Sequence, residues 1–128
     1  MGNKIVIVED SKAISTVLKE VLEAEGHTVK NASDGVNGLA MIRREKPDLV
    51  LLDLLLPKLN GYDVCKAVMM DGRTRHIPVL IMSTLDTPES RMKLQASGAR
   101  HFMKKPYQLD DLLNKIHQLL PNRPQDKN

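Results

Sequence analysis

The sequence predicts an α/β fold in which helices cover both faces of a five-stranded parallel sheet. Short runs rich in Val, Ile and Leu alternate with longer segments whose apolar residues repeat at helical spacing. The central runs are continuously apolar rather than alternating, which is typical of strands buried on both faces. Regular alternation of this kind indicates βα units in a doubly wound sheet.

The first unit begins with residues 4–8, KIVIV, a β-branched run that predicts a strand. Ser11 is a suitable N-cap for the helix that follows, and Gly26 is a suitable stop. Residues 28–32 form a second, weaker strand. The helical repeat between the two strands consists of Ile14, Val17, Leu18, Val21 and Leu22.

A second helix is expected from about residue 35 to 46, because Pro47 disfavours helix in the residue before it. The third strand, residues 49–52, is apolar throughout and leads directly into Asp53. A third helix is expected at residues 62–70.

Residues 77–82 predict a fourth strand, with Pro78 acceptable only near its start. The fourth helix opens at Pro88, which suits the first helical position, and either Thr87 or Asp86 can cap it.

A short fifth strand is expected at residues 100–103. Pro121 ends the last helix, so we expect one domain over residues 1–120 and a polar tail or linker at 121–128. The apolar stripe of that helix is Leu109, Leu112, Leu113, Ile116 and Leu120.

Composition indicates a globular protein of the cytoplasm, with 41% hydrophobic and 27% charged residues, one cysteine and no apolar run that could span a membrane. Residues 65–128 carry 11 basic and 6 acidic side chains, some of them clustered. Nucleic-acid binding is not expected, because this cluster lacks interleaved aromatic residues and any DNA-reading motif.

Polar residues follow the expected strands where each one ends. In strand order 2-1-3-4-5, the carboxyl ends of the first and third strands are neighbours, so Glu9, Asp10 and Asp53 should converge. One lysine cannot neutralise three carboxylates, and an open, all-oxygen cluster suits Mg²⁺. The strand-end residues are Glu9, Asp10, Asp53, Ser83, Thr84 and Lys105.

This set resembles the receiver domain of two-component response regulators, over almost the whole chain to about residue 120. The segment from Asp53 to Gly61, DLLLPKLNG, is similar to that family's D-x-x-x-P-x-x-[DN]-G loop. The family has the flavodoxin-like (βα)5 fold with order 2-1-3-4-5.

The resemblance implies that Asp53 accepts a phosphoryl group from a histidine kinase or phosphotransfer protein. Asp10, Asp53 and the backbone carbonyl of Leu55 would bind Mg²⁺, with Glu9 acting through water. Ser83 and Lys105 would contact the phosphoryl oxygens.

The resemblance also implies that Phe102 is the switch aromatic, which turns inward as Ser83 moves toward the phosphate. It further implies a cis peptide bond between Lys105 and Pro106.

Two positions that would flank the path of the water that hydrolyses the phosphorylated aspartate carry apolar residues rather than polar ones. Leu55 and Leu85, each two residues beyond a site residue, and Thr84 form a crowded rim that we expect to slow autodephosphorylation. Phosphorylation should repack the face made by the fourth helix, fifth strand and fifth helix, where an acidic output protein or homodimer mate would bind. The basic residues expected there are Arg91, Lys93, Arg100 and Lys104.

Three other functions compete with a signalling switch. Phosphatases of the haloacid-dehalogenase type carry D-x-D-x-[TV] after the first strand, whereas the candidate nucleophile here follows the third, so an enzyme is not expected. A flavin-binding protein is disfavoured by the acidic first loop and the scarcity of aromatic residues. A receiver that binds partners without taking phosphate remains the main alternative.

Overall fold

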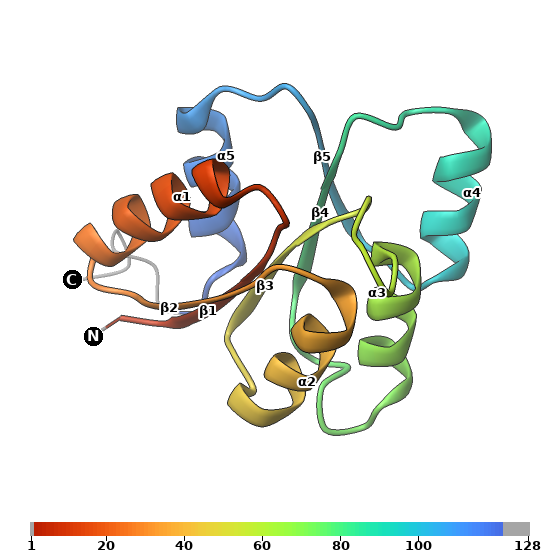
Figure 1. Cartoon of the computed structure of the whole chain (residues 1–128), viewed down its shortest axis with the longest axis horizontal. Coiled ribbons are helices and arrows are strands. Elements are labelled where there is room, and N and C mark those ends of the chain that lie inside the picture. The colour runs from red at the N-terminus through yellow and green to blue at the C-terminus, as the bar shows by residue number, and fades with distance from the viewer. Residues whose placement is uncertain (1, 122–128) are drawn as a thin grey trace.

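The computed structural model describes residues 2–121 and contains ten alternating strands and helices (Figure 1). The predicted tail lies outside the described residues, apart from Pro121. The strands are β1 (Lys4–Val8), β2 (Thr28–Ala32), β3 (Leu49–Asp53), β4 (Val79–Ser83) and β5 (His101–Lys104). The helices are α1 (Lys12–Ala24), α2 (Gly35–Glu45), α3 (Gly61–Met70), α4 (Pro88–Ala96) and α5 (Leu109–Leu119).

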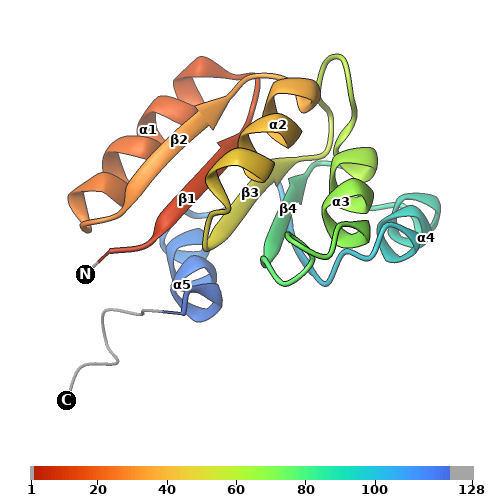
Figure 2. The same ribbon diagram turned by 90° about the horizontal axis from the view of Figure 1, so that it is seen from below.

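The strands form one parallel sheet in the order β2-β1-β3-β4-β5, which confirms the predicted fold. Helices α1 and α5 cover one face, and α2, α3 and α4 cover the other (Figures 1 and 2). Alternate residues of each central strand pack into the two cores: Ile5 and Ile7 face α1 and α5, while Val6 and Val8 face the other layer.

Side-chain caps fix where most helices begin. Ser11 accepts a hydrogen bond from the backbone N–H of Ile14, as predicted, and Asn60 accepts one from Asp63. Thr87, rather than Asp86, caps α4, where it forms a reciprocal capping box with Ser90. These caps set the point at which each loop leaves the sheet.

Two expectations about the elements were wrong in detail, and one pattern left the burial of its residues open. Strand β4 begins at Val79, after Pro78, and includes Ser83, while β5 is shifted by one residue. Helix α1 buries Leu18 and Leu22, whereas the side chains of Ile14 and Val17, in the same apolar repeat, are exposed. No helix within residues 2–121 combines the length and apolar character needed to cross a bilayer.

The start of α2 packs directly against the loop between β3 and α3. A Cβ atom on Gly35 would lie 1.7 Å from the backbone oxygen of Leu59, and the N–H of Gly35 donates to the carbonyl of Pro57. Asp34 caps α2 and forms an ion pair with Lys58 in that loop. The second βα unit therefore holds the loop that follows Asp53.

Gly35→Ala should destabilise the fold by about 1–3 kcal/mol, because the clash is with backbone and must displace the β3–α3 loop. Gly72→Ala is the matched control, since a Cβ there meets nothing within 4 Å, and its expected change is within about 0.5 kcal/mol. Urea unfolding measures both variants. Equal stability of the two would contradict this account of the loop.

Candidate functional site

The site lies at the edge of the sheet where the parallel strands end. Asp53 is the last residue of β3 and Ser83 the last of β4, while Glu9 follows β1. All three are buried, with 7%, 1% and 3% of their surfaces exposed, respectively. Pairing of β1 with β3 and of β3 with β4 brings these residues to one edge.

Glu9, Asp10 and Asp53 form an acidic cluster, as the sequence predicted. A carboxylate oxygen from each lies within 4.8 Å of the other two. Glu9 and Asp53 are buried, and Asp10 is exposed at the opening. Oxygen ligands with one open side fit Mg²⁺, which retains several waters and takes one or two carboxylates.

Lys105 supplies the positive charge within this cluster. Its Nζ atom lies 3.2 Å from Oε1 of Glu9 and 3.4 Å from Oδ2 of Asp53. Burial alone would lower the pKa of Lys105, but the charges of Asp53 and Glu9 outweigh burial and raise it. The ammonium group is therefore retained where the two carboxylates meet.

The Glu9 carboxylate is held from two sides. Its Oε2 atom accepts a hydrogen bond from the Ser11 N–H, and its Oε1 atom contacts Lys105. Burial is the largest effect on its pKa and raises it, and the charge of Asp53 adds to that rise. The bonds from Ser11 and Lys105 oppose the rise but do not cancel it.

Local backbone contacts set the position of Asp53. Its Oδ1 atom accepts a hydrogen bond from the N–H of Leu55 at 3.3 Å. Gly61 packs so closely on this segment that a Cβ atom would lie 2.7 Å from the Asp53 carbonyl oxygen. The glycine of the DLLLPKLNG loop thus permits the close approach of α3.

Ser83 is linked to two neighbouring segments. Its hydroxyl oxygen accepts the N–H of Leu85, and its carbonyl accepts the N–H of Lys105. The serine hydrogen therefore remains available to an oxygen ligand at the edge of the sheet. The Lys105–Pro106 peptide bond is cis, which agrees with the expectation from the resemblance.

The residues predicted to form a rim around the phosphorylation site differ in their exposure to solvent. Leu55 is 56% exposed and Thr84 is exposed, whereas Leu85 is half-buried against the core on the α3 and α4 side. Phe102 is also half-buried and packs against that core. Leu55 is therefore the apolar rim residue most open to solvent.

The predicted basic output face is largely paired within the molecule. Arg91 and Lys104 both form ion pairs with Asp86. Lys93 lies over the ring of Tyr62, 5.5 Å from its centroid. Arg100 forms neither an ion pair nor a cation–π contact within residues 2–121, in contrast to the other three.

Sequence reasoning missed Tyr107. Burial raises the pKa of Tyr107, the charge of Lys105 opposes that rise, and the charges of Glu9 and Asp53 add to it. Its position two residues beyond Lys105 was the available signal. The Tyr107 side chain packs against the core on the α1 and α5 side of the sheet.

A family model, sequence relatives and solved structures all indicate the same protein family for this chain. The model of the response regulator receiver domain matches residues 5–117. Protein PilH of Pseudomonas aeruginosa is 38% identical over 117 residues, which cover 91% of this chain and 97% of PilH. The crystal structure of the chemotaxis response regulator CheY4 of Vibrio cholerae superposes with a TM-score of 0.86 at 28% identity, covering 94% of this chain and 100% of CheY4.

A longer relative is similar over the same region. RpaA of Synechocystis, a DNA-binding dual master transcriptional regulator, is 37% identical over 117 residues, or 91% of this chain. The chain spans about half of RpaA, 48% of its length. The similarity therefore concerns one domain of that regulator.

Asp53→Asn should stabilise the metal-free protein by about 1–2 kcal/mol, because it removes repulsion among three close carboxylates while Lys105 keeps Glu9 as a partner. Urea unfolding in the presence of a chelator measures the change. Glu20→Gln, at an exposed position of α1 away from its first turn, is the control and should shift stability by no more than about 0.5 kcal/mol. A marked loss of stability in Asp53→Asn would mean that the Lys105 ion pair outweighs the repulsion.

Proposed function

This chain belongs to the response regulator receiver domain family, and on that premise we propose that Asp53 is the phosphoacceptor of a two-component signalling switch. The observation that carries the proposal is the position of Asp53 at the sheet edge, with Lys105 at 3.4 Å and two more carboxylates nearby. The donor is a phosphohistidine on a histidine kinase or phosphotransfer protein. The receiver domain is proposed to span residues 1–120.

In the transfer, an oxygen of the Asp53 carboxylate attacks phosphorus as the bond from phosphorus to the donor imidazole breaks. The imidazole leaves with the electron pair of that bond and takes up a proton. The product is an acyl phosphate on Asp53. Lys105 stabilises the negative charge on the phosphoryl oxygens as a point charge.

Mg²⁺ is the proposed cofactor, held by Asp10, Asp53 and the Leu55 carbonyl, with Glu9 acting through water. When bound, the ion neutralises charge on the acidic cluster and on the phosphoryl oxygens. The donor set supports this assignment, because oxygens of three carboxylates lie within 4.8 Å of one another while the Lys105 ammonium group pairs with only Glu9 and Asp53.

Ser83 and Phe102 are proposed to transmit the signal. Because the Ser83 oxygen accepts the Leu85 N–H, its hydrogen can be donated to a phosphoryl oxygen. Movement of Ser83 toward the phosphate would let Phe102 turn inward and shift a pre-existing equilibrium between two conformations. The affected face is formed by α4, β5 and α5, where an output protein or a second copy of the chain would bind.

Treatment with a small phosphodonor and Mg²⁺ should add one phosphate to the wild type, read by intact mass. Asp53→Ala should gain none, because it lacks the carboxylate nucleophile. Asp63→Ala, a control at an exposed position on α3, should be phosphorylated like the wild type. If the wild type stays unmodified while it still binds Mg²⁺, the domain acts instead as a phosphorylation-independent interaction module.

Leu55→Asn should shorten the lifetime of the phosphorylated state about three- to tenfold, a change of up to about 1.4 kcal/mol in the barrier. Leu55 is the most exposed apolar rim residue, and an amide there can orient a hydrolytic water. Decay of the phosphorylated mass after donor removal gives the rate. Leu85→Glu tests the other side of the rim, and a lifetime unaffected by either change would exclude control by this rim.

A further inference from the structure

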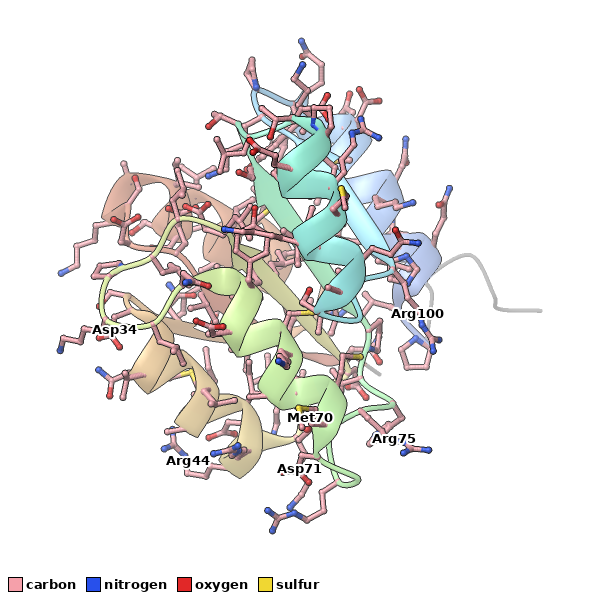
Figure 3. The ribbon with its side chains drawn as sticks, turned by 90° about the vertical axis from the view of Figure 1, so that its right-hand side faces the viewer. Asp34, Arg44, Met70, Asp71, Arg75 and Arg100 are labelled. Atoms are coloured by element: carbon pink, nitrogen blue, oxygen red, sulfur yellow. The ribbon has the colours of Figure 1, made fainter. Side chains whose placement is uncertain are left out.

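A second polar site lies at the opposite edge of the sheet, where β4 and β5 begin. A cavity of about 100 Å³ opens there between the C-terminal half of α3, the loop before β4 and the loop before β5. Its polar lining is Arg75, His76, Arg100 and His101, and its apolar lining includes Met69 and Ile77. Figure 3 shows Arg75 and Arg100 on the same side of the molecule.

The two arginines of this cavity differ from the other arginines that the structure describes. Neither Arg75 nor Arg100 forms an ion pair within residues 2–121. Each of the others lies within 4 Å of a carboxylate, the set being Arg43, Arg44, Arg73 and Arg91. Two exposed arginine residues therefore line one cavity without an acidic partner from the described part of the chain.

The surroundings of the cavity are also positive. Burial lowers the pKa of His101, and the positive charges of Lys115 and Arg100 lower it further. At the nearby helix ends, one backbone carbonyl of α3 and one of α4 accept side-chain hydrogen bonds. Thr74 Oγ1 donates to the Val68 carbonyl of α3, and Ser97 Oγ donates to the Leu94 carbonyl of α4.

We propose that this cavity binds a phosphate group, either as inorganic phosphate or as a small phosphate monoester. Guanidinium groups recognise phosphate with paired, charge-assisted hydrogen bonds, and the two imidazoles add further donors. The cavity volume of about 100 Å³ leaves room for a tetrahedral oxyanion. The apolar lining would contact the organic part of an ester.

The test uses the whole 128-residue chain carrying Asp53→Ala, without Mg²⁺, so that its outcome is independent of phosphoacceptor chemistry. Inorganic phosphate is titrated against chloride at matched ionic strength, and NMR signals of Gly98, Ala99 and the His101 ring report on the cavity. These signals should shift and saturate with phosphate but not with chloride. Absence of a saturable shift would overturn the proposal.

Replacing both Arg75 and Arg100 with Gln should weaken phosphate binding at least tenfold. The matched control replaces Arg73 and Arg91 with Gln, which removes the same charge from arginines outside the cavity. In the control, Arg43 still faces Asp71 and Lys104 still faces Asp86, so neither acid loses every partner. A control that weakens binding as much as the test pair would mean that overall charge, not the cavity, attracts the anion.

Phenyl phosphate distinguishes the two sources of the phosphate group. Tighter binding than inorganic phosphate indicates an ester whose organic part contacts Met69 and Ile77, and equal binding indicates the free ion. A peptide of glutamate residues without phosphate tests whether the surface binds acidic proteins instead of phosphate. If this peptide shifts the same signals at lower concentration than either phosphate compound, the surface serves an acidic protein and the phosphate proposal fails.

Discussion

Three carboxylates converge at the carboxyl edge of the sheet, where the Lys105 ammonium group pairs with two of them, and the rest of the site depends on how the fold holds them together. Glu9, Asp10 and Asp53 lie within 4.8 Å of one another. Two like charges 4 Å apart repel by about 4 kcal/mol at an effective dielectric constant of 20. Lys105 and the Ser11 N–H offset part of this repulsion, and the remainder makes the cluster a strong attractor for a divalent cation.

The buried strands make this strained arrangement possible. Residues of β1 and β3 just before the acids are fully buried, so the backbone from which Glu9 and Asp53 project cannot move apart without exposing both cores. The loop beyond Asp53 is fixed in turn by Gly35 and Gly61, where backbone segments approach too closely for a side chain. Core packing therefore holds the three carboxylates close together, although their mutual repulsion would separate them if they were free in water.

The sequence sufficed to predict the sheet order and the acidic cluster, because both follow from strand periodicity and from the rule that parallel strands end at one edge. It could not decide which apolar residues of α1 face the sheet. Ile14 and Leu18 belong to the same helical repeat, yet only Leu18 is buried, because the width of the contact depends on the neighbouring strands. The sequence did not predict the ion-pair partners either. Asp86 and Lys104 are well separated along the chain, but the fold brings them together.

The same topology separates opposite charges. Parallel strands place the acids at the carboxyl edge, while Arg75 and Arg100 lie in loops that enter β4 and β5 at the amino edge. A strand of five residues spans about 16 Å, roughly twice the Debye length of about 8 Å at physiological ionic strength. Direct attraction between the two clusters is therefore largely screened at their exposed ends. Two strands connect the cavity to the site: β4 runs from Val79 to Ser83, and β5 begins at His101 and leads to Lys105 at the acidic cluster.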